Sequence, residues 1–284
     1  MNRLLILLPQ RYIMKYSIYF LAAVLLLLRM NVAAGQVFKN KDLQISVLLE
    51  NVWVIETSDM TTMYLIEGKE KALLIDTGTR CDSLDKVIRK VTQKPLEVVL
   101  THAHGDHAGN IRYFNTVWMH PADTVILRGG YSGKIRFVND GDRFDLGGRT
   151  IEVYHMPAHT PGSIVLADKA SRSCFSGDAF GSGLVWLQLR PLAPMQTYIT
   201  SCKAMLKVMD SGIDSIYCGH YPYLKRALDR EYIVRMKDLA GLIAEGKAAG
   251  TKPYDIVIPG GCPDPMIATD GVVSIVYDPA NIRK

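Results

Sequence analysis

The sequence has little of what marks a membrane, fibrous or disordered protein. Only one long apolar run occurs in 284 residues, which excludes a protein with several membrane spans. No repeat or low-complexity segment follows residue 36, and 23 Gly with 13 Pro show no three-residue period, so collagen-like and disordered chains are excluded too. With 48% hydrophobic and 21% charged residues, the composition is that of a globular protein long enough to bury a sizeable core.

Cysteine is scarce as well. The chain has five cysteines, at positions 81, 174, 202, 218 and 262. An odd and widely scattered set is not a disulfide framework, although one bridge remains open. Cys174 and Cys218 end apolar runs, and we expect them to be small buried apolar side chains.

Acidic residues are absent from the first 35 residues. Four basic residues lie there: Arg3, Arg11, Lys15 and Arg29. An apolar run over 17–28 follows three of them, and small residues at 33–35 end the segment, which predicts a signal peptide over 1–35 and a secreted or periplasmic protein. A membrane anchor is the alternative, but the run is shorter than the ~20 residues that a span needs. Translation from Met1 and from Met14 both remain open.

Removal of this segment lowers the formal net charge from +5 to +1, because it carries four positive charges and no acid. A near-neutral chain lacks the cationic face that binds phosphates, so nucleic acid is not an expected partner. We expect a small-molecule substrate, and contact with a membrane only through the signal sequence during export. The oligomeric state stays open.

Short apolar runs bounded by turn residues predict many strands. They cover 45–49, 52–56, 63–67, 72–75, 96–100, 151–155, 163–166, 172–175 and 215–218, with a final pair at 254–258 and 272–277. Helical spacing of apolar residues predicts helices over 83–91, 196–209 and 230–249. No linker divides 36–284, so we predict a single α/β domain in which two mixed sheets stack and helices cover the outer faces.

Three of the seven histidines lie within six residues, directly after the apolar strand at 96–100. The segment reads Thr101-His102-Ala103-His104-Gly105-Asp106-His107-Ala108-Gly109-Asn110. Loops at the carboxyl ends of such strands build sites in α/β proteins. Alternate residues of an extended loop point the same way, so His102 and His104 can converge on one ion. Asp106 and His107 follow the turn at Gly105 and can face a neighbouring position. These ligand types suit Zn, Fe or Mn.

Three further strands are each followed by a histidine or aspartate beside glycine or proline. These residues are His159, Asp178 and His220. Without a metal, the upstream cluster would contain several uncompensated polar groups. We therefore expect the three residues to complete a set of seven ligands.

With these residues in place, the stretch 43–225 resembles the metallo-β-lactamase superfamily of metal-dependent hydrolases, whose HxHxDH core is a specific signature. The resemblance implies a four-layer αβ/βα sandwich of two mixed β-sheets flanked by helices, with a two-metal site on one edge. It implies that the first metal is held by His102, His104 and His159, the second by Asp106, His107 and His220, and that Asp178 bridges them.

Other positions also match the family. Asp76, in Asp76-Thr77-Gly78, matches a position that supports the metal-binding loop from behind the ligands, although an aspartate that caps a turn is the alternative. Asp178 and the phrase beginning at His159 look like glyoxalase II and the lactonases, whereas true β-lactamases usually carry Cys or Ser at the bridging position. The strands expected over 254–277 depart from glyoxalase II, whose corresponding part is helical and binds glutathione.

The expected function is that of an exported zinc-dependent hydrolase with two Zn²⁺ per chain, with Fe or Mn as alternative metals. A metal-activated bridging hydroxide would cleave an ester, thioester, lactone or amide carbonyl, with Asp106 accepting a proton and Tyr221 donating to the oxyanion. Expected substrate contacts are Trp186, Arg190 and Tyr198. The alternative for each of them is packing in the core or exposure on the surface without a role in binding. The alternatives are a β-lactamase, an iron-dependent redox member resembling a persulfide dioxygenase, and a non-catalytic binding module.

Overall fold

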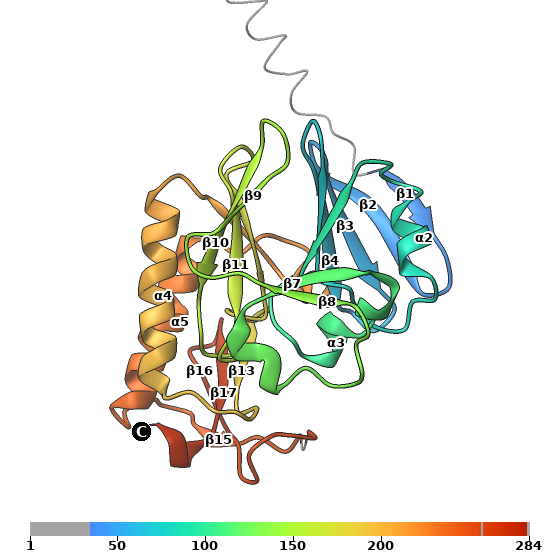
Figure 1. The fold of residues 1–284 in the computed structure, drawn as a ribbon. Coiled ribbons are helices and arrows are strands. Elements are labelled where there is room, and N and C mark those ends of the chain that lie inside the picture. Colours follow the sequence, from blue (N-terminus) through green and yellow to red (C-terminus); the bar gives the residue numbers. More distant parts are fainter. Residues whose placement is uncertain (1–34, 257, 283–284) are drawn as a thin grey trace, which may run out of the picture. The chain divides into compact units, whose positions relative to one another are not determined.

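Two large β-sheets stack face to face in the computed structural model, which describes residues 35–256 and 258–282 (Figure 1). The first sheet has eight strands in chain order: β1 (Gln36–Lys39), β2 (Leu43–Leu49), β3 (Val52–Thr57), β4 (Thr62–Glu67), β5 (Ala72–Ile75), β6 (Leu96–Val99), β7 (Thr116–Met119) and β8 (Lys134–Phe137). The second has the order β14 (Ser215–Cys218), β12 (Ser173–Gly177), β11 (Ile164–Asp168), β10 (Thr150–His155) and β9 (Arg143–Asp145). Both sheets are mixed, because β5 to β8 pair in parallel and so do β12 and β14.

Helices cover the outer face of each large sheet. Helices α4 (Met195–Asp210) and α5 (Arg230–Ala244) lie against the second sheet, and α2 (Leu84–Ile88) and α3 (Gly105–Ala108) lie against the first (Figure 1). Four short 3-10 helices complete the elements: η1 (Ile111–Tyr113), η2 (Pro121–Val125), η3 (Tyr221–Tyr223) and η4 (Pro279–Asn281). The expected four-layer αβ/βα sandwich is confirmed.

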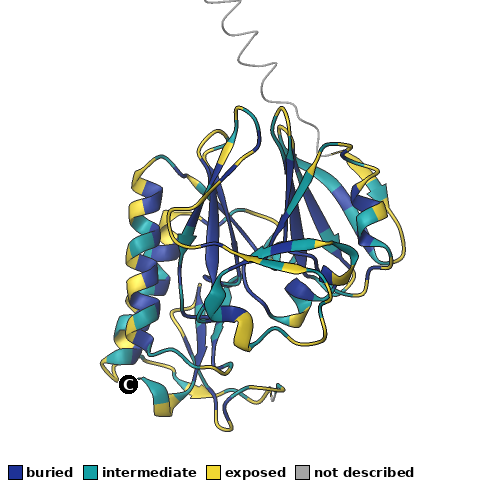
Figure 2. Cartoon of the chain, in the orientation of Figure 1, coloured by how far each residue is buried: buried dark blue, intermediate teal, exposed yellow. Residues whose placement is uncertain are grey.

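Side chains of β4 show why the central strands are apolar throughout. Met63 and Leu65 belong to the core beneath α2, whereas Tyr64 and Ile66 belong to the core between the two sheets. Successive strand side chains point to opposite faces, so a strand covered on both faces needs apolar residues at every position. Figure 2 shows this burial running through the middle of both sheets.

A third, smaller sheet departs from the sequence analysis. Its order is β13 (Leu184–Leu187), β17 (Ser274–Tyr277), β16 (Met266–Thr269) and β15 (Lys252–Pro253). The predicted pairing of 254–258 with 272–277 is wrong, because β17 pairs with β16 and β13 instead. Pro253 is the last residue of β15, and Pro259, directly after 254–258, has no N–H to donate to a strand ladder.

Other differences lie at element ends and in short strands. Helix α5 ends at Ala244 rather than 249, because Gly246 adopts a left-handed φ of 70° that closes the helix. Strands β1, β7, β8 and β9 have three or four residues each and carried too little pattern to be predicted. All five cysteines are free and buried, as expected for Cys174 and Cys218.

The predicted signal peptide and the alternative membrane anchor fall on residues 1–35, which lie almost wholly outside the described residues. Among the helices that the structure describes, none is long and apolar enough to cross a membrane.

Candidate metal centre

Seven imidazole and carboxylate side chains meet at the edge of the sandwich where β6, β10, β12 and β14 end. They form two groups, whose potential ligand atoms lie within 4.8 Å of one another in each group. The first group is His102, His104 and His159, and the second is Asp106, His107, Asp178 and His220. The structure thus brings together all seven residues that the sequence analysis singled out as ligands.

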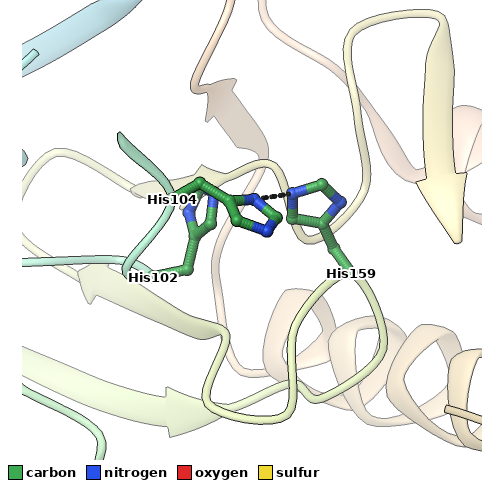
Figure 3. A group of neighbouring side chains, drawn as sticks. All are labelled: His102, His104 and His159. Atoms are coloured by element: carbon green, nitrogen blue, oxygen red, sulfur yellow. Dashed lines mark hydrogen bonds between the residues drawn. The ribbon is translucent and has the colours of Figure 1, made fainter. Parts of the chain in front are cut away.

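The first group consists of three imidazoles from two loops. Figure 3 shows the rings of His102, His104 and His159 turned toward one another. Nδ1 of His104 lies 3.0 Å from Nε2 of His159, and the ring of His102 lies 4.9 Å from each of the other two, measured between centroids. Two histidines come from the loop after β6, and the third comes from the loop between β10 and β11.

The second group combines two imidazoles with two carboxylates. Nε2 of His220 lies 3.4 Å from Oδ2 of Asp106 and 3.2 Å from Oδ2 of Asp178. Nε2 of His107 lies 3.6 Å and 3.5 Å from oxygens of the same two residues. Oδ2 of Asp178 also lies 3.8 Å from Nε2 of His159, so this carboxylate is next to both groups.

Four of the five imidazoles are held through Nδ1, which leaves Nε2 directed at the groups. His159 donates to the carbonyl of Trp186 at 2.8 Å, and His220 donates to the carbonyl of Met60 at 3.2 Å. His102 and His107 are held in the same way by a side-chain oxygen each. Such outer hydrogen bonds fix the tautomer and the orientation of a metal-binding imidazole.

Asp76 orients the loop that carries the clustered histidines. Its Oδ2 accepts from Nδ1 of His107 at 2.8 Å and from the hydroxyl of Thr101 at 2.8 Å, and that hydroxyl contacts Nδ1 of His102. Its Oδ1 accepts from the backbone N–H of Thr101 at 2.7 Å. The side chain is buried behind two potential ligands, which is the supporting position that the family resemblance implies rather than a simple turn cap.

Glycine is required next to His220. A Cβ at residue 219 would lie 2.4 Å from Oδ1 of Asp178 and 2.6 Å from the ring of His107. The backbone of Gly219 is held in this close approach by hydrogen bonds to Gly177 and Thr62. Packing of the second group therefore depends on a missing side chain at this position.

Asp123, on η2, was missed in the sequence analysis. It is fully buried and joins the two loops of the first group: Oδ2 accepts from the backbone N–H of Ala103 and from the hydroxyl of Thr160, both at 2.9 Å, and Oδ1 accepts from the N–H of Gly162 at 2.6 Å. Ala103 lies between His102 and His104, and Thr160 follows His159. The sequence offers no signal for this residue except an aspartate shortly after His120-Pro121, because its hydrogen-bond partners are distant in the chain.

Burial and neighbouring charges set different protonation states in the two groups. Burial holds the pKa of His102 well below its usual value, and burial followed by the neighbouring His159 lowers that of His104 to about 3. Burial also disfavours protonation of His107, but the nearby carboxylates, Asp106 first, outweigh it and hold its pKa well above the usual value. His102 and His104 are therefore neutral imidazoles, whereas the second group pairs imidazolium with carboxylate, where a bound cation replaces protons.

Three buried polar atoms of the two groups have no hydrogen-bond partner among the residues that the structure describes. They are Nε2 of His102, Nε2 of His107 and Oδ1 of Asp178. Leaving such atoms unpaired in a protein interior costs free energy, and lone pairs from imidazole and carboxylate are ligands for Zn, Fe and Mn. The residues present therefore fit a pair of divalent cations.

The residues expected to contact substrate are not all at the centre. Tyr198 lies on the inner face of α4, fully buried in the apolar core with Cys202 and Met205, so its assignment as a substrate contact is wrong. Trp186 is half-buried, and its backbone carbonyl contacts Nδ1 of His159. Arg190 is exposed. The spacing of apolar residues over 196–209 predicts a helix, but it does not predict that the hydroxyl group of Tyr198 faces the core.

Tyrosines after His220 are arranged differently from the expectation. Tyr221 packs toward the core between the sheets, with its ring 5.9 Å from that of Tyr217 and its backbone N–H donating to Thr62. Tyr223 instead has its ring 5.8 Å from that of His220 and is 62% exposed. The turn of η3 thus places Tyr223, which the sequence analysis did not single out, on the open side of the second group.

Comparisons with known proteins agree with this geometry. A model of the Metallo-beta-lactamase superfamily matches residues 57–261. The chain is 28% identical over 208 residues to Acyl-coenzyme A thioesterase MBLAC2 of Gallus gallus, covering 58% of this chain and 74% of that protein.

Solved structures show the same fold. A metallo beta lactamase of Erythrobacter litoralis has a TM-score of 0.56 at 19% identity, covering 72% of this chain and 98% of its own. TTHA1623 in a di-iron-bound form has a TM-score of 0.52 at 26% identity, covering 62% and 93%.

Replacement of Asp123 tests whether it positions the first group. In Asp123→Asn an amide NH₂ must face one of the three donors, so we expect metal affinity to fall roughly 10- to 100-fold, as is typical when a group that orients ligands is removed. Competition with a chromophoric chelator measures the affinity. The matched control is Asp214→Asn, an exposed carboxylate that pairs with Arg172 and precedes β14, whereas His220 follows that strand. Wild-type affinity in Asp123→Asn would show that the loops hold their places without it.

Proposed function

The chain belongs to the metallo-beta-lactamase superfamily, and from that premise we propose that it is a dinuclear, zinc-dependent hydrolase of thioesters. The observation that carries the proposal is the pair of ligand groups joined by Asp178, whose carboxylate lies beside both. The thioester is favoured over other carbonyl substrates because the relative at 28% identity is an acyl-coenzyme A thioesterase. Asp178 counts against a β-lactamase, since that branch usually lacks an aspartate at this position.

Seven residues would hold the metals. His102, His104 and His159 would bind one ion, Asp106, His107 and His220 the other, and Asp178 would contact both. Zinc accepts this mixture of nitrogen and oxygen ligands, and iron is the alternative because TTHA1623 is known in a di-iron-bound form. When bound, two such ions supply a water of lowered pKa and polarise the carbonyl of the substrate.

The two carboxylates divide the remaining work. The side chain of Asp106 is 40% exposed, against 15% for Asp178, so it is the one that solvent and substrate reach. Oδ2 of Asp106 faces the imidazoles of His107 and His220, which leaves Oδ1 to accept a proton from water and pass it to the leaving group. Asp178, held between imidazoles, supplies negative charge where two cations would otherwise repel.

Tyr223 is the aromatic side chain that we propose for contact with the acyl group. Its exposed ring beside His220 offers apolar surface at the open side of the second group. Tyr221, the residue first considered as a donor to the oxyanion, has its recorded contacts on the core side.

Removal of a ligand should remove metal and activity together. We expect His104→Ala to lose one metal equivalent and Asp178→Ala to lose most of both, each with at least a 100-fold lower kcat, because an incomplete site neither binds its ion nor supplies the activated water. Elemental mass spectrometry and a thioesterase assay on the same samples give the two values. The control is Asp214→Ala. A variant that keeps full metal content and full turnover would refute its ligand assignment.

The two tyrosines offer a separate comparison. We expect Tyr223→Ala to raise KM for a long-chain acyl thioester several-fold with little change in kcat, and Tyr223→Phe to restore it, because the ring rather than the hydroxyl makes the contact. Tyr221→Phe should leave both constants near wild type. A large fall in kcat for Tyr221→Phe alone would return the oxyanion role to Tyr221.

A further inference from the structure

Trp186, in β13, and Gln188, directly after that strand, carry hydrogen-bond donors without an acceptor in the described part of the chain. Val185 and Leu187 point into the apolar core shared with α4 and α5, so the alternation of an extended chain directs Trp186 and Gln188 to the opposite face. Among the described residues, neither Nε1 of Trp186 nor Nε2 of Gln188 has a hydrogen-bond partner, and both atoms are shielded from water.

Unpaired buried donors are costly, and these two stand at alternate positions of an extended segment, one in β13 and one directly after it, so they form a row. The indole N–H of Trp186 can only donate, and the free half of the Gln188 amide is its donor. The row therefore lacks acceptors, and a ligand that presents carbonyl oxygens at intervals along a chain would supply them.

Two arginines stand at the far end of this row. The backbone N–H of Arg190 donates to the carbonyl of Gly260 at 2.9 Å, and a guanidinium nitrogen of Arg128 lies 3.7 Å from where a Cβ of residue 260 would be. Within the described part of the chain, neither arginine has a carboxylate within 4 Å. Gly260 itself leaves room beside Arg128, whereas a Cβ at residue 261 would lie 3.2 Å from the Ile258 side chain and 3.5 Å from Oε1 of Gln188, so the glycine backbone closely approaches Gln188.

The row starts at the metal centre. The carbonyl of Trp186 accepts from Nδ1 of His159, so the strand that carries the donors is also the strand that anchors a ligand of the first group. Arg190 follows four residues later, which corresponds to at most about 14 Å of extended chain. Along the chain from the residue that anchors His159, the order of donors and cations is thus indole, amide, guanidinium.

We propose that this face, defined by Trp186, Gln188, Arg190 and Arg128, binds the pantetheine and phosphate portions of a coenzyme A thioester. With the thioester at the metal centre, the amide carbonyls of the pantetheine arm face Trp186 and then Gln188, and the phosphates reach the two guanidinium groups. The assignment rests on the proposed thioesterase function and adds to it which part of the substrate each residue recognises.

These contacts can be tested separately with thioesters that share one acyl group but differ in the length of the thiol carrier. The carriers are coenzyme A, pantetheine, which has both amides and no phosphate, and N-acetylcysteamine, which has only the amide nearest the sulfur. We expect Arg190→Glu to raise KM roughly tenfold or more for the coenzyme A thioester and less than twofold for the other two. Gln188→Met should raise KM for the first two carriers by a similar factor and leave the N-acetylcysteamine thioester unchanged.

Matched variants on α4 provide the controls. Lys203→Glu makes the same change of charge at an exposed position, and Gln196→Met makes the same change of side chain, so both should match wild type on all three carriers. Wild-type KM values that do not differ among the carriers would overturn the proposal. So would an Arg190→Glu variant that is impaired equally on all of them.

Calorimetry with free coenzyme A keeps this test independent of catalysis. Binding by the wild-type protein that weakens tenfold or more in Arg190→Glu, but not in Lys203→Glu, supports the face even if no thioester is hydrolysed, in which case only the proposed function fails. Absence of coenzyme A binding by the wild-type protein overturns the assignment of the face, even if short thioesters are hydrolysed.

Discussion

The convergence of four strand ends on one edge of the sandwich is the constraint on which the rest of the structure depends. Strands β6, β10, β12 and β14 each end in a loop there, so His107 and His220, far apart in the chain, come to lie around the same carboxylate of Asp178. Concentrating these groups leaves two imidazole nitrogens and one carboxylate oxygen buried without a hydrogen-bond partner in the described part of the chain. A fold keeps such costly atoms together when a ligand satisfies them, and a pair of cations is the ligand whose chemistry they match.

The support behind the ligands combines backbone carbonyls with buried side-chain carboxylates. Carbonyls of Trp186 and Met60 hold two imidazoles, and Asp76 and Asp123 hold the loops from behind. Asp123 joins loops from different sheets, so the two halves of the sandwich are connected at the centre as well as through their shared core. The third sheet takes part in this through β13, which anchors His159 with its backbone and presents free donors with its side chains.

The local sequence sufficed to predict the ligand residues, but not the residues that surround them. Each ligand stands beside a strand end marked by Gly or Pro, so position along the chain sufficed to predict all seven, and Asp76 lay in a recognisable Asp76-Thr77-Gly78 turn. Asp123, by contrast, has partners only through tertiary contacts. The directions of Tyr198, on a helix buried on one face, and of Tyr223, on a 3-10 turn, depend on packing that the spacing of residues does not specify. The pairing of β13 with β17 joins segments that are far apart in the chain, so it too depends on packing that local residue spacing does not specify.

The central claim is that the two groups hold two zinc ions that perform the hydrolysis. Elemental mass spectrometry of the protein, paired with a thioesterase assay before and after chelation and after return of zinc, tests it most directly. The account predicts two zinc ions per chain, loss of activity on their removal and recovery on their return. A single iron per chain, or activity that survives complete removal of metal, would contradict it.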